Sequence, residues 1–264
     1  MPSLKNIALI ILVKTLVKFA DAEIANVSNY SEECYLECGE TFQIFENYIN
    51  ETAKINSAEL NCTSNVPFNQ FQALKSLYDT TAGNYWLWPT KGNGSHWNFR
   101  DANSSNYPNP CERWYGVVCT SNRTELNDGA ACSIYGLQLA GYNLTGTLPP
   151  DIVNLTELVS LSLPDNHIKG AIPTELGLMT NLEVLNLFNN SLTNIIPSEM
   201  GQLRLLRFLN LANNQLVSSI PTVLGYLTDL VEWYLNSNKL VGTIPSEIGS
   251  LTALQGTILE LIAY

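Results

Sequence analysis

Histidine and basic residues are scarce in this sequence, which contains 2 His and 13 Lys plus Arg against 24 Asp plus Glu. The formal net charge of −11 argues against a surface that neutralises the phosphates of nucleic acids or anionic lipids. No P-loop, Gly-x-Gly-x-x-Gly, His-Glu-x-x-His or Gly-x-Ser-x-Gly motif occurs, and His96 and His167 lie where solvent-facing side chains are expected. The sequence therefore predicts a protein that is not an enzyme and that holds no cofactor or metal ion.

Long apolar runs are also lacking after the first 22 residues, and a membrane-spanning helix needs about 20 mostly apolar residues. Residues 1–22 begin with the basic Lys5, continue with the apolar stretch 7–13 and end in the small-x-small site 20–22. This order is typical of a secretory signal peptide. An uncleaved amphipathic or membrane-anchoring helix is the alternative. Lys14 and Lys18 interrupt the apolar run, which weakens the case for a membrane-spanning helix far more than that for a signal peptide. We therefore expect a protein that is secreted or displayed at the cell surface.

Sequons for N-glycosylation occur at roughly twice the number that the Asn, Ser and Thr content gives by chance. Their frequency fits a glycosylated extracellular surface, and we expect glycans at these positions. The ten sequons begin at Asn26, Asn29, Asn50, Asn61, Asn93, Asn103, Asn122, Asn143, Asn154 and Asn189.

The six cysteines form an even set, as expected for disulfides in an oxidising compartment. They are Cys34, Cys38, Cys62, Cys111, Cys119 and Cys132. The first three lie in segment 23–66, which is acidic: residues 21–59 hold nine acidic side chains and one basic side chain. A zinc site is the alternative use of such cysteines, and the scarcity of histidine and the export signal disfavour it. Six cysteines allow 15 pairings, so the connectivity stays open.

The most specific feature is a repeat with a period of 24 residues that needs no gap. A fixed period of this kind predicts a solenoid of stacked units, because a single unit cannot bury its own apolar face. Leucine, asparagine, isoleucine, proline and glycine each recur in a column of their own. The columns are Leu158, Leu182, Leu206, Leu230 and Leu254; Asn166, Asn190, Asn214 and Asn238; Ile172, Ile196, Ile220 and Ile244; Pro173, Pro197, Pro221 and Pro245; and Gly177, Gly201, Gly225 and Gly249.

Each column has a structural interpretation. The leucines of 182–187 alternate as in a short strand. Asn190 follows where the chain turns, and its amide can satisfy the backbone groups of a turn as both donor and acceptor. Pro197 suits the start of a short helical or 3-10 turn. A further column, which holds glycine in three repeats, predicts a left-handed backbone that Asn194 tolerates and Ser218 fits less well.

From Leu158 onward, the pattern LxxLxLxxNxLxGxIPxxLGxL resembles the plant-type leucine-rich-repeat family. The resemblance implies an α/β fold: a right-handed solenoid with a parallel β-sheet on its concave face and 3-10 or short helical turns on its convex side. Residues 133–264 hold five full repeats and one partial repeat, of which the first is degenerate. The repeats start at Ile134, Leu158, Leu182, Leu206, Leu230 and Leu254.

Segment 67–132 is similar to the N-terminal cap of the same family through its motif PCERWYGVVC. The resemblance implies a disulfide between Cys111 and Cys119, for which Cys132 could compete. The stretch FNQFQALKSLYDTT has apolar residues at helical spacing and predicts the amphipathic helix of the cap. The tryptophans that follow could form an aromatic groove for sugars, but sealing the open end of the core is the favoured interpretation. These are Trp86, Trp88, Trp97 and Trp114.

A ligand is expected on the concave sheet, at the residues between the strand leucines. Phe188, Phe208 and Tyr234 lie on a diagonal across three repeats, and we interpret them as an exposed aromatic patch that anchors the ligand. A glycan on Asn189 would narrow this face. The predicted ligand-binding residues are Val184, Asn186, Phe188, Phe208, Asn210, Glu232 and Tyr234.

The resemblance favours a recognition module for an extracellular protein, peptide or glycan, as in the ectodomains of receptor-like kinases and receptor-like proteins, with a co-receptor or a second copy as a possible partner. The alternative is a secreted hydrolase inhibitor similar to polygalacturonase-inhibiting proteins, and a third is a structural wall or adhesion protein. The final residues, TILELIAY, depart from the repeat pattern. This departure predicts a truncated gene model or a longer parent protein with a membrane anchor, and a soluble form that dimerises through this end is the alternative.

Overall fold

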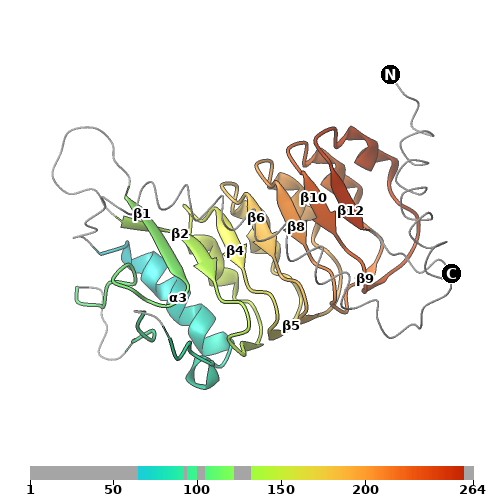
Figure 1. The fold of residues 1–264 in the computed structure, drawn as a ribbon. Coiled ribbons are helices and arrows are strands. Elements are labelled where there is room, and N and C mark those ends of the chain that lie inside the picture. The colour runs from blue at the N-terminus through green and yellow to red at the C-terminus, as the bar shows by residue number, and fades with distance from the viewer. Residues whose placement is uncertain (1–64, 92–93, 100–104, 122–131, 259–264) are drawn as a thin grey trace, which may run out of the picture. The chain divides into compact units, whose positions relative to one another are not determined.

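The computed structural model describes residues 65–91, 94–99, 105–121 and 132–258. The predicted signal peptide, the acidic segment with its three cysteines, and seven of the ten sequons lie outside these residues. The described residues form a solenoid in which successive coils stack side by side, preceded by a cap that contains the helix α3 (Figure 1).

A seven-stranded sheet runs along the solenoid (Figure 1). Its order is β1-β2-β4-β6-β8-β10-β12, and every pair is parallel except the antiparallel pair β1 and β2. In the parallel pairs, residues 24 apart lie side by side, as Val184 and Phe208 do, so the period of the sequence is the register of the sheet. The strands are β1 (Val117–Ser121), β2 (Cys132–Gln138), β4 (Ser160–Ser162), β6 (Val184–Asn186), β8 (Phe208–Asn210), β10 (Glu232–Tyr234) and β12 (Gly256–Ile258).

The leucines of each coil fill one continuous core. Leu182, Leu185 and Leu187 have no exposed surface, because alternate side chains of a strand point to the same face of the sheet. In the fifth repeat, Trp233 stands where the other full repeats have leucine, and it is equally buried.

The side chains of the asparagine column form hydrogen bonds between each coil and the one before it. The Asn190 Oδ1 accepts a hydrogen bond from the Ile168 backbone N–H at 3.0 Å, and its Nδ2 donates to the Leu163 carbonyl at 2.9 Å. Both partners belong to the preceding repeat, and Asn190 is buried. Asn166, Asn214 and Asn238 make the equivalent bonds, so the prediction of a turn-satisfying asparagine is correct.

Short 3-10 helices form the convex side, and each follows a proline in extended conformation. Proline suits this place because its fixed φ leads the chain into the turn. Gly177 allows these helices to stack closely, since a Cβ built on it would lie 2.3 Å from the Glu199 carbonyl oxygen of the next repeat. The helices are η2 (Pro150–Asn154), η3 (Thr174–Leu178), η4 (Ser198–Gln202), η5 (Thr222–Tyr226) and η6 (Ser246–Ser250).

Two smaller parallel sheets run between the concave and convex sides, in the orders β3-β5-β7 and β11-β9. The predicted left-handed column lies at or next to their strands: φ is 115° at Gly146, 80° at Gly170, 66° at Asn194, 72° at Ser218 and 89° at Gly242. The strands are β3 (Thr145–Gly146), β5 (His167–Gly170), β7 (Ser191–Leu192), β9 (Val217–Ser218) and β11 (Lys239–Leu240).

Replacing Ser218 by glycine is expected to stabilise the protein by about 1 kcal/mol, which corresponds to a rise in Tm of about 2–4 °C. A left-handed backbone is sterically unfavourable for serine but not for glycine. This steric penalty is larger than the destabilisation that glycine causes by raising the entropy of the unfolded chain. The side chain of Ser218 is exposed, so its loss removes no packing. Thermal unfolding followed by circular dichroism measures the shift. The converse change, Gly170→Ser, should lower Tm, and a fall in Tm for Ser218→Gly would contradict the argument.

The cap closes the N-terminal end of the core. Helix α3 (Phe68–Thr80) buries one face, including Phe71, Leu74 and Leu77, as its helical spacing predicts. Its end is docked on the first repeat, because the Thr80 carbonyl oxygen lies where a Cβ on Gly146 would stand, only 2.0 Å away. Glycine is therefore required at this contact by close approach as well as by backbone conformation.

A disulfide joins Cys111 to Cys119, as the family resemblance implied, and Cys132 is disulfide-bonded too, so it does not take Cys119. Trp86, Trp97 and Trp114 are buried among each other, with ring centroids 5.0 Å apart between the first two. These three tryptophans seal the end of the core. Trp88, which is half-buried, stacks on the exposed His96 at 4.9 Å.

Candidate functional site

The predicted ligand-binding residues come together on the face of β6, β8 and β10. The register places Val184, Phe208 and Glu232 in one row and Asn186, Asn210 and Tyr234 in the next. Phe188 follows two residues after β6. The sheet therefore assembles side chains from three repeats into one surface, as the 24-residue period predicts.

The prediction that Phe188, Phe208 and Tyr234 are all exposed is wrong for two of the three. Phe208 has no exposed surface and Tyr234 retains 6%, whereas Phe188 is half-buried. The rings of Phe208 and Tyr234 pack against each other with their centroids 5.9 Å apart, so each covers part of the other. Neighbouring strands are separated by only about 4.8 Å, so large side chains in adjacent rows cover one another's surface. Phe208 and Tyr234 alternate along their strands with the core residues Leu209 and Trp233, so their side chains point to the opposite face of the sheet.

The two asparagines on this face are engaged with the backbone. The Asn186 Oδ1 accepts a hydrogen bond from the Phe188 N–H at 3.0 Å, and the Asn210 Oδ1 does the same with the Ala212 N–H. Each asparagine is 2% exposed. Their geometry is that of an Asx turn, which fixes the strand end where Phe188 begins. Sequence reasoning treated these amides as ligand contacts; the i to i+2 bonding habit of asparagine could have indicated this further role.

Glu232 is the one acidic side chain among the predicted ligand-binding residues, and it is half-buried. Burial raises the pKa of its carboxyl group above the ordinary value for glutamate, while a hydrogen bond donated by the Tyr234 hydroxyl lowers it. That bond is 2.9 Å long. The site thus combines shielded aromatic rings with a carboxylate that is poorly solvated and able to pair with a cation.

We expect Glu232→Gln to stabilise the protein at pH 8 by up to about 1 kcal/mol, with no difference near pH 4. Because the pKa of Glu232 is raised on folding, its favourable contribution is present below the unfolded-state pKa and is lost as the pH rises through the folded-state pKa. Urea unfolding at several pH values measures the difference. Tyr234→Phe alone should steepen the pH dependence of the free energy of unfolding. In a protein that already carries Glu232→Gln, the same change should leave that pH dependence unaltered.

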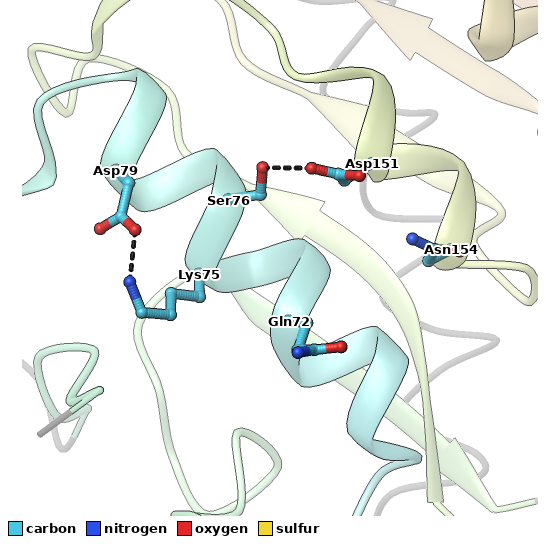
Figure 2. Close-up of a pocket in the computed structure, with 6 residues that line it drawn as sticks. All are labelled: Gln72, Lys75, Ser76, Asp79, Asp151 and Asn154. Carbon is cyan, nitrogen blue, oxygen red and sulfur yellow. Dashed lines mark hydrogen bonds and ion pairs between the residues drawn. The ribbon is translucent and has the colours of Figure 1, made fainter. Parts of the chain in front are cut away.

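A second, polar cleft of about 350 Å³ lies between α3 and η2 (Figure 2). Across it, the Ser76 hydroxyl donates a hydrogen bond to the Asp151 carboxylate at 2.7 Å, and Lys75 forms an ion pair with Asp79 along the helix. Sequence reasoning missed this cleft because its two walls are far apart in the chain. It is lined by Gln72, Lys75, Ser76, Asp79, Asp151 and Asn154.

Within the residues that the structure describes, no group of three or more His, Cys, Asp and Glu side chains could hold a metal ion. The same part of the chain contains no helix that is long and apolar enough to cross a membrane. Three predicted glycosylation sites fall within it: Asn143, Asn154 and Asn189.

The stacked 24-residue coils, with a parallel strand and a 3-10 helix in each, define the class of leucine-rich-repeat solenoids. Residues 156–216 match the family described as leucine rich repeat. A comparison with curated protein sequences gives no significant match. Comparison with solved structures gives many, and three illustrate them.

The ectodomain of the receptor kinase SOBIR1 from Arabidopsis thaliana is 26% identical with a TM-score of 0.59, and the match covers 74% of this chain and 93% of that one. The ectodomain of GASSHO1/SCHENGEN3 from the same plant, in complex with CASPARIAN STRIP INTEGRITY FACTOR 2, is 35% identical with a TM-score of 0.59, covering 74% of this chain and 21% of that one.

The BIR3–SERK2 complex from Arabidopsis thaliana gives 29% identity and a TM-score of 0.52 over 72% of this chain and 97% of the matched one. The present chain thus spans nearly all of the shorter ectodomains and about a fifth of the long one. Residues 156–216 are thus leucine-rich repeats, and the chain is similar in fold to the ectodomains of plant leucine-rich-repeat receptor kinases.

Proposed function

We propose that this protein is an extracellular recognition module that binds an extended peptide segment across β6, β8 and β10. The observation that carries the proposal is that the register of the sheet gathers the half-buried Phe188 and Glu232 onto one face with Tyr234, whose hydroxyl donates a hydrogen bond to the Glu232 carboxylate. Aromatic side chains that become fully buried on binding are the usual energetic anchors of protein interfaces. Support comes from the similar ectodomains solved with a bound factor or a partner protein.

The chemistry of the surface points to a particular kind of segment. An apolar or aromatic residue of the ligand would pack against the half-buried ring of Phe188. A lysine, arginine or terminal amine of the ligand would pair with Glu232, whose poor solvation strengthens the interaction with a cation. The expected ligand is therefore a peptide that carries an apolar residue close to a basic one.

The test is a selection of random peptides displayed on phage against the full chain exported from secretory cells, followed by affinity measurements on the enriched peptides. We expect Tyr234→Ala to weaken binding by at least about 30-fold and Glu232→Gln by about tenfold. Matched controls on the convex side are Tyr226→Ala and Glu247→Gln, both exposed, which should leave the affinity unchanged. Circular dichroism verifies that each variant is folded.

Peptides that lack the apolar and basic pair, or that bind Tyr234→Ala as tightly as the wild type, would contradict the proposal. Binding that is lost with Tyr226→Ala instead would move the recognition surface to the convex side.

A further inference from the structure

We propose that an N-glycan on Asn154 seats its first N-acetylglucosamine in the polar cleft between α3 and η2 and so fastens the cap to the first repeat. Asn154 is the last residue of η2 and begins the sequon Asn154-Leu155-Thr156. The inference rests on the extracellular location in the proposed function, because only an exported chain receives such a glycan.

Asn154 differs from the other two sequon asparagines in the described part of the chain. The Asn143 Nδ2 donates a hydrogen bond to the Tyr85 carbonyl at 3.1 Å, and the Asn189 Nδ2 donates one to the Asp165 carboxylate at 2.8 Å. The Asn154 amide makes no hydrogen bond with any described residue. Its side chain projects from η2 toward α3, at the edge of the cleft (Figure 2). A sugar attached there would start at the edge of the cleft and could extend into it.

The cleft has the chemistry that a sugar requires. Its volume of about 350 Å³ is within the range of small-molecule sites. Ser76 is hydrogen-bonded to Asp151, and Lys75 is paired with Asp79, so these four side chains already have partners. Gln72 is exposed and has no partner among the described residues. Its carboxamide both donates and accepts hydrogen bonds, as the hydroxyl and acetamido groups of N-acetylglucosamine demand.

The attachment is a balanced group transfer from a lipid-linked oligosaccharide, the donor supplied in the secretory pathway. A bond forms between the Asn154 Nδ2 and C1 of the first sugar, and the bond between C1 and the phosphate oxygen breaks. The amide loses one proton and the lipid diphosphate leaves, so nothing is oxidised or reduced.

The first experiment compares two variants that remove a sequon without changing its asparagine. Thr156→Ala removes the sequon of Asn154, and Ser191→Ala removes that of Asn189 as the matched control. In protein exported from secretory cells, we expect Thr156→Ala to lower Tm by about 2–4 °C and Ser191→Ala to lower it by less than about 1 °C. In protein from a bacterial periplasm, which lacks this glycosylation, both changes should be small.

The second experiment separates the first sugar from the rest of the glycan. Protein with high-mannose glycans is treated with an endoglycosidase that leaves one N-acetylglucosamine, or with an amidase that removes the whole glycan. The trimmed form should keep the Tm of the untreated protein, and the fully stripped form should lose about 2–4 °C. Gln72→Ala should lower Tm in the glycosylated protein only.

Peptide mapping by mass spectrometry distinguishes failure of this inference from failure of the proposed extracellular location. Secreted protein that carries a glycan on Asn189 but none on Asn154 overturns this inference alone. An occupied Asn154 with equal Tm for the trimmed and stripped forms also overturns it. Protein retained in the cell without any glycan overturns both this inference and the extracellular location.

Discussion

Replacing Asn190 by alanine is expected to lower the free energy of unfolding by about 3 kcal/mol. The change leaves the buried Ile168 N–H without its acceptor and removes one of the two side-chain donors of the Leu163 carbonyl, which keeps the bond from the Asn166 Nδ2. Both groups belong to the preceding repeat. An unsatisfied buried backbone group costs about 1–3 kcal/mol because water cannot reach it. Urea unfolding followed by circular dichroism should show a lower midpoint with an unchanged m-value.

Asn181 supplies the matched control. Its Nδ2 also bonds a carbonyl of the preceding repeat, that of Thr156 at 2.9 Å, but Asn181 is exposed. Asn181→Ala should therefore cost less than about 1 kcal/mol, because water replaces the lost partner. Equal losses for the two variants would show that burial is not what makes the asparagine column essential.

The sequence predicts the repeats because each recurring column of the repeat meets a local structural requirement, such as strand register, a turn or a left-handed backbone. The 24-residue period sets the register between Val184 and Phe208, and the asparagine column supplies the bonds of the turns. Even the poor fit of Ser218 to the left-handed column is visible from the sequence, and the structure gives it a φ of 72°. These features depend on residues within one repeat or in its neighbour.

The candidate site is less predictable because the exposure of a side chain depends on the size of the side chains beside it on adjacent strands. The repeat pattern does not specify those sizes. The period places Phe208 and Tyr234 correctly on the sheet face, but it does not indicate that their rings pack against each other and have little exposed surface. The polar cleft is harder still to predict, since Gln72 and Asn154 line one cleft only when the cap is docked on the first repeat. No spacing in the sequence indicates that α3 and η2 lie side by side.

Gly177→Ala is expected to destabilise the protein by about 2–3 kcal/mol, although alanine is normally more stable than glycine in a helical turn. Gly177 has an ordinary negative-φ backbone, so conformational strain is not the reason. The cause is crowding: the new Cβ would lie 2.3 Å from the Glu199 carbonyl oxygen and 2.5 Å from its carbon. Both atoms are backbone of the next coil, so η3 and η4 must move apart.

Thermal and urea unfolding of Gly177→Ala measure this cost, and Gly136→Ala is the control. A Cβ on Gly136 would meet its nearest atom, the Val118 Cβ, at 3.4 Å, which is ordinary contact, so that variant should stay within about 0.5 kcal/mol of the wild type. Gly225→Ala should behave like Gly177→Ala, since its Cβ would lie 2.5 Å from the Glu247 carbonyl oxygen. A stable Gly177→Ala protein would mean that the coils can separate freely, and the glycine column would then need another explanation. Loss of stability in both column variants, with Gly136→Ala unaffected, would establish that glycine recurs every 24 residues because adjacent coils touch through their backbones.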